Sequence, residues 1–260
     1  GHLRDPLLER LLDTRLDALA PADKRRLATQ CFKVNHPTML EPFPAYRRLY
    51  TLWKTIEESG EAGLAYLSGQ YLADLVTWYH LVWTGETVRR ARPDLLALMD
   101  KGENFTLDDR RALFDLYGEV ITSLLPRYRQ MAERGQIELS ATPHSHPILP
   151  LLLDFQAARE ARPDLPVPAA PAYPGGAARA RAHVDAALAD HRAHFGQAPG
   201  GFWPAEGGVS EAAVRLLAAA GVKWAASGEG VLRHSLAAAQ LDLSQKAEWS
   251  TTPYRLPGAD

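Results

Sequence analysis

The spacing of apolar residues changes near Gly135, and this change restricts the chain to folds that contain two kinds of structure. Before residue 135, apolar side chains recur every three or four positions, which is the period of a helix packed on one face. After it, short apolar segments alternate with helical stretches, as in β/α units. The sequence therefore predicts an α/β chain in which residues 1–134 are mainly helical and residues 135–260 carry the strands.

In the first region we find helical spacing but no segment with the alternation of a strand. The Thr106 hydroxyl is placed to cap a helix, and Asp108 and Asp109 follow where carboxylates meet unpaired N–H groups. We therefore expect a helix to begin at Leu107. The helical stretches of this region are Pro6–Leu19, Tyr46–Ile56, Ala62–Val82 and Leu107–Met131.

In the second region, two glycines mark the points where a helix is followed by a strand. Gly135 and Gly221 both come directly after helical stretches and are expected to adopt the left-handed C-cap conformation. Arg162–Pro174 contains five prolines, which excludes regular structure and predicts a loop. The segments that alternate are Ile137–Leu139, Ile148–Arg159, Ala177–His194, Phe202–Trp203, Glu211–Ala219 and Lys223–Ala226.

Composition excludes several classes of function. The 29 basic and 31 acidic side chains leave a net charge of -2, so no strong field attracts nucleic acid. Cys31 is the single cysteine, which excludes an internal disulfide and a thiolate metal cluster, and a buried position is expected for it. No apolar run is long enough to cross a bilayer. We therefore predict a soluble protein, and the low cysteine content favours the cytoplasm.

The first group of residues with chemical potential follows Gly135. Glu138 lies in the middle of a short apolar stretch, and His144 and His146 come just after it. Ligands bind at the carboxyl ends of strands in α/β barrels. A plainer interpretation places Glu138 on a solvent-facing edge strand, with the histidines capping the next helix. The His-x-His pair also suggests half of a metal site, but no third ligand has suitable spacing nearby, so no metal is predicted.

The second group lies between a predicted strand and a predicted helix. Glu206 is flanked by glycines and follows Trp203, and Ser210 is placed to cap the helix that begins at Glu211. A barrel enzyme carries its reacting groups on such loops. Alternatively, Glu206 only compensates the positive end of the following helix and Trp203 is a core residue. The glycines do not have the order of a phosphate-binding loop.

Together these groups resemble the signature regions of family-57 glycoside hydrolases, the α-amylase, 4-α-glucanotransferase and branching-enzyme group. Gly135–Leu139 together with His146–Leu152 is similar to the second signature, and Trp203–Glu206 is similar to the third. The stretches Asp74–Trp83 and Lys101–Gln136 are similar to the long helical insertion of bacterial members. The resemblance covers nearly the whole chain.

This resemblance implies a partial (β/α)7 barrel with a large inserted helical region, acting on α-glucans or maltooligosaccharides with retention of configuration. Glu206 would be the nucleophile, and Glu138, His144, His146 and Trp203 would contact the sugar. No cofactor is implied. Hydrolysis, transglycosylation and branching stay open at this stage, as does the oligomeric state.

Three features of the sequence depart from the family pattern. No His-Gln-Pro element precedes Pro6, and Ser227-Gly228-Glu229 stands where a Thr-Asp-Glu-like run is common. The fourth signature, which carries the aspartate that acts as acid/base, is absent, so we expect that residue beyond Asp260. From these gaps we predict that the 260-residue segment alone binds sugars weakly and has almost no activity.

Two other functions are open to a chain with these residues. A metal-dependent carbohydrate deacetylase would use His144 and His146 together with an Asp-Asp pair, for which Asp108-Asp109 is the candidate in the sequence. A non-catalytic carbohydrate-binding module would hold a glycan with its aromatic side chains, and it leaves Glu206 without a role. The tryptophans available to such a module are Trp78, Trp83 and Trp203.

Overall fold

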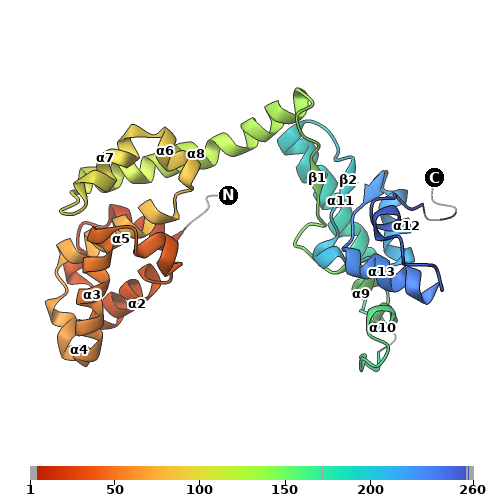
Figure 1. The fold of residues 1–260 in the computed structure, drawn as a ribbon, viewed down its shortest axis with the longest axis horizontal. Helices are drawn as coiled ribbons and strands as arrows, with labels where there is room; N and C mark the ends of the chain where they lie inside the picture. The colour runs from red at the N-terminus through yellow and green to blue at the C-terminus, as the bar shows by residue number, and fades with distance from the viewer. Residues whose placement is uncertain (1–4, 171, 256, 258–260) are drawn as a thin grey trace. The chain divides into compact units, whose positions relative to one another are not determined.

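The computed structural model describes residues 5–170, 172–255 and 257. The chain forms two compact units, one up to Ser123 and one from Leu124 onward (Figure 1). Each unit has its own hydrophobic core. Helix α8, Leu107–Glu133, begins in the first unit and ends in the second, so the division of the chain falls within this helix and not at the predicted boundary after residue 134.

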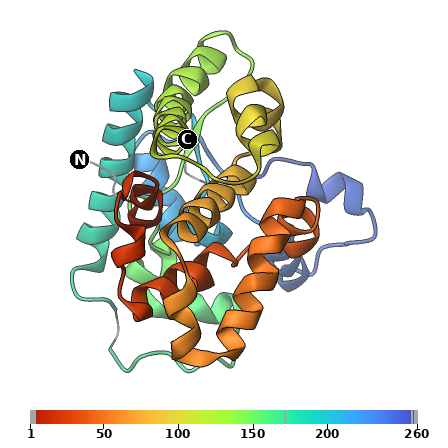
Figure 2. The same cartoon turned by 90° about the vertical axis from the view of Figure 1, so that its left-hand side faces the viewer.

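The regular structure of the first unit's described residues is all helical, and helix α5, Gly69–Trp83, runs through its core (Figure 2). This helix is apolar on nearly all sides, which is the pattern of a helix surrounded by others. The Ser68 hydroxyl caps its start by accepting the Tyr71 N–H at 3.1 Å. The other α-helices are α1 Pro6–Glu9, α2 Pro21–Cys31, α3 Pro44–Glu58, α4 Gly60–Gly63, α6 Glu86–Ala91, α7 Pro93–Lys101 and the start of α8.

The predicted start of α8 at Leu107 is confirmed, and its cap is reciprocal. Thr106 Oγ1 accepts the Asp109 N–H at 3.2 Å, and Asp109 Oδ2 accepts the Thr106 N–H at 2.7 Å. Two other expected helices are interrupted. The expected helix Pro6–Leu19 is interrupted at Asp13, whose backbone is extended. The expected helix Ala62–Val82 is interrupted at Leu67 and Ser68, because Ser68 is the N-cap of a new helix.

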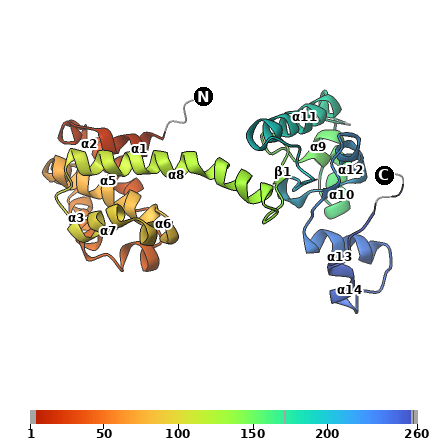
Figure 3. The same ribbon diagram turned by 90° about the horizontal axis from the view of Figure 1, so that it is seen from above.

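The second unit contains a sheet of three short parallel strands in the order β1-β2-β3. They are β1 Ser140–Ala141, β2 Gly201–Phe202 and β3 Trp224–Ala225, and their register pairs Ser140 with Gly201 and Gly201 with Trp224. The α-helices are the end of α8, α9 Leu149–Leu153, α10 Ala158–Ala161, α11 Gly176–Phe195, α12 Glu211–Ala219, α13 Glu229–Ala238 and α14 Lys246–Ser250 (Figure 3).

One face of this sheet packs against helices. Phe202 is fully buried in a core formed with Leu149 of α9, Val184 of α11 and Leu217 of α12. Side chains alternate between the two faces of a strand, so Gly201 and its neighbours in register lie on the opposite face. That second face carries Trp224, which is 40% exposed.

Several predictions about this unit are confirmed. Gly135 and Gly221 have φ values of 67° and 85°, as left-handed helix caps require. The Ser210 side chain accepts the Ala213 N–H at the start of α12, which spans Glu211–Ala219 as expected. The proline-rich stretch from Arg162 has no helix or strand in its described part.

Strand positions differ from the prediction by up to three residues. The first strand is Ser140–Ala141 instead of Ile137–Leu139, so Glu138 precedes the strand and its side chain is exposed. The stretch Ile148–Arg159 is not one helix, because Asp154 is extended and its carboxylate caps a new turn by accepting the Gln156 N–H at 2.8 Å.

In the part of the chain that the structure describes, none of the helices combines the length and the apolar character that crossing a bilayer requires.

Candidate active site

Glu206 lies in a short turn, Ala205–Gly207, between the carboxyl end of β2 and the start of α12. Its φ of 56° and ψ of 18° place it in the left-handed region, which side chains other than glycine rarely adopt. Its side chain is 72% exposed, so a ligand has access to the carboxylate from solvent. Such a strained conformation is often found at functional sites.

His146 brings a second functional group to this carboxylate. It lies in the loop after β1, and its Nε2 is 3.7 Å from Glu206 Oε1. The other ring nitrogen, Nδ1, lies 3.1 Å from Thr142 Oγ1, which fixes the orientation of the ring. His146 also has a positive φ, 57°. The loops after two neighbouring parallel strands therefore place an imidazole beside the carboxylate.

His144 belongs to a different set of contacts. Its Nε2 lies 3.6 Å from Asp190 Oδ2 on α11, and its Nδ1 is 2.9 Å from Ser145 Oγ. Its backbone N–H donates to the carbonyl of His183 at 3.1 Å, which ties the loop to α11. The two histidines of the His-x-His pair thus have separate partners, and His146 is the one beside Glu206.

Glu138 accepts a hydrogen bond of 2.8 Å from the indole N–H of Trp224. The contact joins the segment before β1 to β3. Trp203 is 49% exposed, so the interpretation of it as a buried core residue is wrong. Its backbone N–H donates to the Ala141 carbonyl at 2.8 Å and continues the pairing of β2 with β1.

A hydrogen bond also connects the loops after β2 and β3. The Ser227 hydroxyl donates to the Gly207 carbonyl at 2.6 Å, next to Glu206 in sequence. Ser227 therefore supports the turn that holds Glu206. Nothing in the sequence indicated this role, since Ser227 stood out only as a departure from the family pattern.

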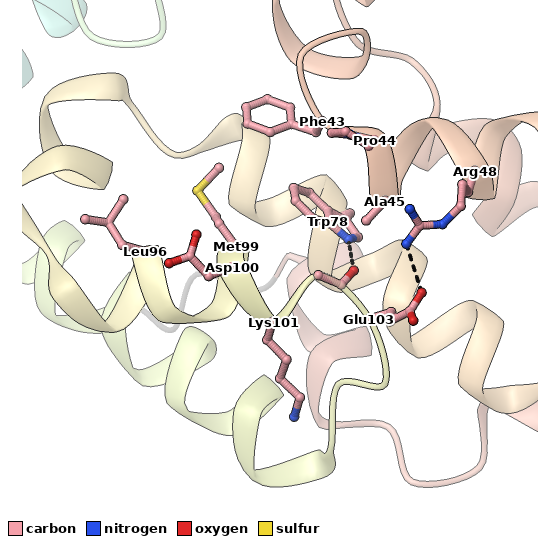
Figure 4. Close-up of a pocket in the computed structure, with 11 residues that line it drawn as sticks. Phe43, Pro44, Ala45, Arg48, Trp78, Leu96, Met99, Asp100, Lys101 and Glu103 are labelled. Carbon is pink, nitrogen blue, oxygen red and sulfur yellow. Dashed lines mark hydrogen bonds and ion pairs between the residues drawn. The ribbon is translucent and has the colours of Figure 1, made fainter.

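The helical unit contains a pocket of about 450 Å³, which none of the predicted site residues lines (Figure 4). At its base the Trp78 indole N–H donates to the Gly102 carbonyl at 2.6 Å, and Arg48 pairs with Glu103 at 2.9 Å on its rim. Trp78 is only 2% exposed. It therefore packs mainly in the core of the helical unit, and its N–H is already bonded within the protein.

Among the residues that the structure describes, no group of three or more His, Cys, Asp or Glu side chains is arranged to hold a metal ion. Asp109, one member of the Asp-Asp pair considered for a deacetylase, is engaged by Lys101 and by Thr106 at the start of α8. Burial raises the pKa of the Asp109 carboxyl, but the hydrogen bonds from Lys101 and Thr106 together outweigh it and hold the pKa below its usual value.

Comparison with models of known protein families gave one match. The model of the family described as glycosyl hydrolase family 57 matches residues 15–258. The chain belongs to glycosyl hydrolase family 57. Searches of curated proteins and of solved structures gave no match. The resemblance inferred from the two signature-like regions is confirmed, and family 57 membership makes a carbohydrate the expected substrate.

For this family 57 chain, sequence signals named Glu206, His146 and Trp203 as candidates but did not indicate the contact of Trp224 with Glu138. The signal that was available is the pair of glycines at positions 200 and 201, which leaves room for a large neighbour on the next strand. It acquires that meaning only when the register of the strands is known.

Proposed function

We propose that this family 57 protein is a retaining glycoside hydrolase or transglycosylase that acts on α-glucans, with Glu206 as its nucleophile. The observation that carries the proposal is the accessible Glu206 carboxylate beside His146, on the loops after two adjacent parallel strands. Family membership supplies the class of bond, and this geometry supplies a group able to attack it.

The proposed architecture is an arc of a (β/α)7 barrel. Connections between parallel strands are almost always right-handed, so strands added in one direction carry their helices on one face. The order β1-β2-β3, with the core of α9, α11 and α12 on one face, is consistent with such an arc. A doubly wound sheet would reverse the direction of strand addition and cover both faces.

In this proposal the Glu206 carboxylate attacks the anomeric carbon, and the bond from that carbon to the leaving-group oxygen breaks. A second carboxyl group about 5 to 5.5 Å away protonates that oxygen. The same group then takes a proton from water or a sugar hydroxyl, which attacks the anomeric carbon and releases Glu206.

His146 has a positioning role in the same proposal. Its ring nitrogen is close enough to Glu206 to restrict the rotation of the carboxylate, and Thr142 holds the ring in turn. Because reaction rates depend steeply on the alignment of the attacking atom, such a contact affects turnover more than substrate affinity.

The test is Glu206→Gln in the full-length protein, assayed with maltoheptaose. The variant keeps the size of the side chain and removes the attacking charge, so turnover is expected to fall at least about a thousandfold. Glu211→Gln is a matched control, because Glu211 is an exposed carboxylate on α12 that pairs with Arg215. Turnover near the wild-type rate in Glu206→Gln would exclude Glu206 as the nucleophile.

A second measurement distinguishes the nucleophile from an acid/base. In Glu206→Gly, azide has space to attack the anomeric carbon from the face where the carboxylate stood. The expected product from an activated α-glucosyl substrate is the β-glucosyl azide, since a single displacement inverts configuration. An α-glucosyl azide would assign Glu206 to the acid/base role instead.

A further inference from the structure

The turn that carries Glu206 contains two consecutive residues with left-handed backbone. Glu206 has a φ of 56° and Gly207 a φ of 66°, and the Gly208 N–H donates to the Ala205 carbonyl at 2.9 Å across them. Positive φ at both central residues is the pattern of a type I′ turn, in which glycine, asparagine and aspartate are preferred. Glutamate is disfavoured at the first central position, so this turn needs support from another part of the chain.

Ser227, in the loop after β3, supplies this support. Its hydroxyl donates to the Gly207 carbonyl at 2.6 Å, and the side chain is half-buried. The sheet determines where the hydroxyl lies, because the Ala226 N–H, one residue earlier, donates to the Phe202 carbonyl of β2 at 3.0 Å. A return of Glu206 to negative φ would rotate the peptide groups that follow it and break the bond to Ser227. The bond therefore favours the left-handed state of Glu206.

The backbone of the same loop packs directly against the turn. A Cβ at Gly207 would stand 3.3 Å from the backbone nitrogen of Gly228 and 3.8 Å from the Cα of Ser227. The first of these separations is tight for a side-chain carbon, so any larger residue at position 207 would press on the loop. Gly207 thus permits both the positive φ of the turn and the close approach of Ser227.

Two neighbouring loops hold the candidate nucleophile in different ways. From the loop after β1, the His146 ring restricts the carboxylate itself, with Nε2 3.7 Å from Glu206 Oε1. From the loop after β3, Ser227 restricts the backbone that carries this carboxylate. The Glu206 side chain is 72% exposed, so packing alone restrains it little. Its direction therefore depends on such polar contacts.

We propose that Ser227 is a positioning residue for the glycosyl transfer, and that its hydrogen bond to the Gly207 carbonyl keeps the Glu206 carboxylate aimed at the anomeric carbon. The inference rests on the function proposed above and adds to it a residue that acts through Glu206. Misalignment of the attacking atom slows the bond-breaking step more than it weakens substrate binding. Loss of the Ser227 hydroxyl should therefore lower kcat and leave KM nearly unchanged.

Steady-state kinetics of the full-length protein with maltoheptaose tests this expectation. Ser227→Ala should lower kcat about tenfold, with KM within about twofold of the wild-type value. Ser227→Thr keeps the hydroxyl, so its kcat should stay within about threefold of the wild type. Gly207→Ala should also lower kcat, because its methyl group presses on the loop that carries Ser227.

Two controls on α13 match these changes. Ser235→Ala removes an exposed hydroxyl that donates within its own helix, to the Val231 carbonyl at 2.9 Å. Gly230→Ala adds a methyl group where a Cβ has no neighbour within 4 Å. Both variants should keep kcat and KM within about twofold of the wild type.

A second measurement separates positioning of the nucleophile from a general effect on the site. In Glu206→Gly, azide from solution replaces the carboxylate, and the turn no longer aims the attacking atom. Adding Ser227→Ala should therefore change the rate of β-glucosyl azide formation by less than about twofold. A tenfold loss in this reaction too would show that Ser227 acts on substrate binding or on the fold, and it would overturn the inference.

A wild-type kcat in a folded Ser227→Ala variant would overturn the inference as well. If that variant does not fold, Gly207→Ala decides by the same two measurements. Loss of turnover in Glu206→Gln together with a wild-type kcat in Ser227→Ala would overturn the positioning role alone. Normal turnover by Glu206→Gln would overturn the proposed nucleophile and the role of Ser227 with it.

Discussion

His146 Nε2 lies 3.7 Å from Glu206 Oε1, and both residues have positive φ angles. Each residue stands on a loop that follows a strand of the parallel sheet, β1 for the histidine and β2 for the glutamate. Left-handed backbone at a residue other than glycine costs about 1 to 3 kcal/mol, and two such positions meet at this contact. Selection for stability alone would favour glycine at both.

The first prediction follows from the separation of the two histidines. His146→Ala should lower kcat by about 10- to 100-fold, because the Glu206 carboxylate loses the ring that restricts it. His144→Ala is the matched control, since His144 contacts Asp190 and Ser145 instead. Steady-state kinetics with maltoheptaose separates kcat from KM. Equal losses of kcat in the two variants would contradict a specific role for His146.

A second prediction concerns the strain at position 206. Glu206→Gly removes the cost of a left-handed side chain, so the variant should be as stable as the wild type or up to about 1 kcal/mol more stable, while its turnover is lost. Gln240→Gly is the control, because Gln240 has a φ of 57° and is exposed. That variant should gain stability and keep its activity. Urea unfolding and a turnover assay measure both properties, and a clear loss of stability in Glu206→Gly would contradict the argument.

Asp74 provides a third prediction, on the helical unit. Its buried carboxylate accepts the backbone N–H groups of Phe105 at 2.8 Å and Asn104 at 3.0 Å, and the Gln70 amide at 2.8 Å. Asp74→Ala leaves these donors without their acceptor, so the free energy of unfolding should fall by about 2 to 4 kcal/mol. The measurement is urea unfolding followed by tryptophan fluorescence.

Asp108→Ala is the control for this change, because the Asp108 side chain is 92% exposed and pairs with Arg111 at the surface. Its effect should stay within about 0.5 kcal/mol. Equal stability of the Asp74 and Asp108 variants would show that the carboxylate does not hold the segment that leads into α8.

The features predicted correctly from sequence are those determined by a few neighbouring residues. The caps at Thr106, Ser210 and Gly135 depend on groups within four positions along the chain, so the residue types alone indicate them. The loop position of Glu206 was predicted for the same reason, since a strand, glycines and a capped helix follow one another in order.

The features that sequence reasoning missed depend on partners far apart in the chain. The position of β1 is determined by the pairing of Ser140 with Gly201, so the strand lies after the apolar residues Ile137–Leu139 instead of on them. The bond between Glu138 and Trp224 joins residues 86 positions apart, so no local pattern reveals it. The separation of His144 from His146 likewise depends on α11, which supplies Asp190.

The last prediction concerns His80, which is buried in α5 and whose Nδ1 lies 2.8 Å from the Val76 carbonyl. Burial lowers the pKa of His80 below its usual value of 6.5. A lowered pKa means that the folded protein favours the neutral ring, so this contribution to stability is present above pH 6.5 and is lost as the pH falls through the folded value.

The melting temperature should therefore drop between pH 7.5 and pH 5, a range above that in which carboxylates such as Asp109 take up protons. His80→Gln, which cannot take up this proton, should show a shallower drop, whereas His234→Gln, at an exposed position on α13, should follow the wild type. Identical pH profiles for the wild type and His80→Gln would show that the imidazole is not protonated at a cost to the fold.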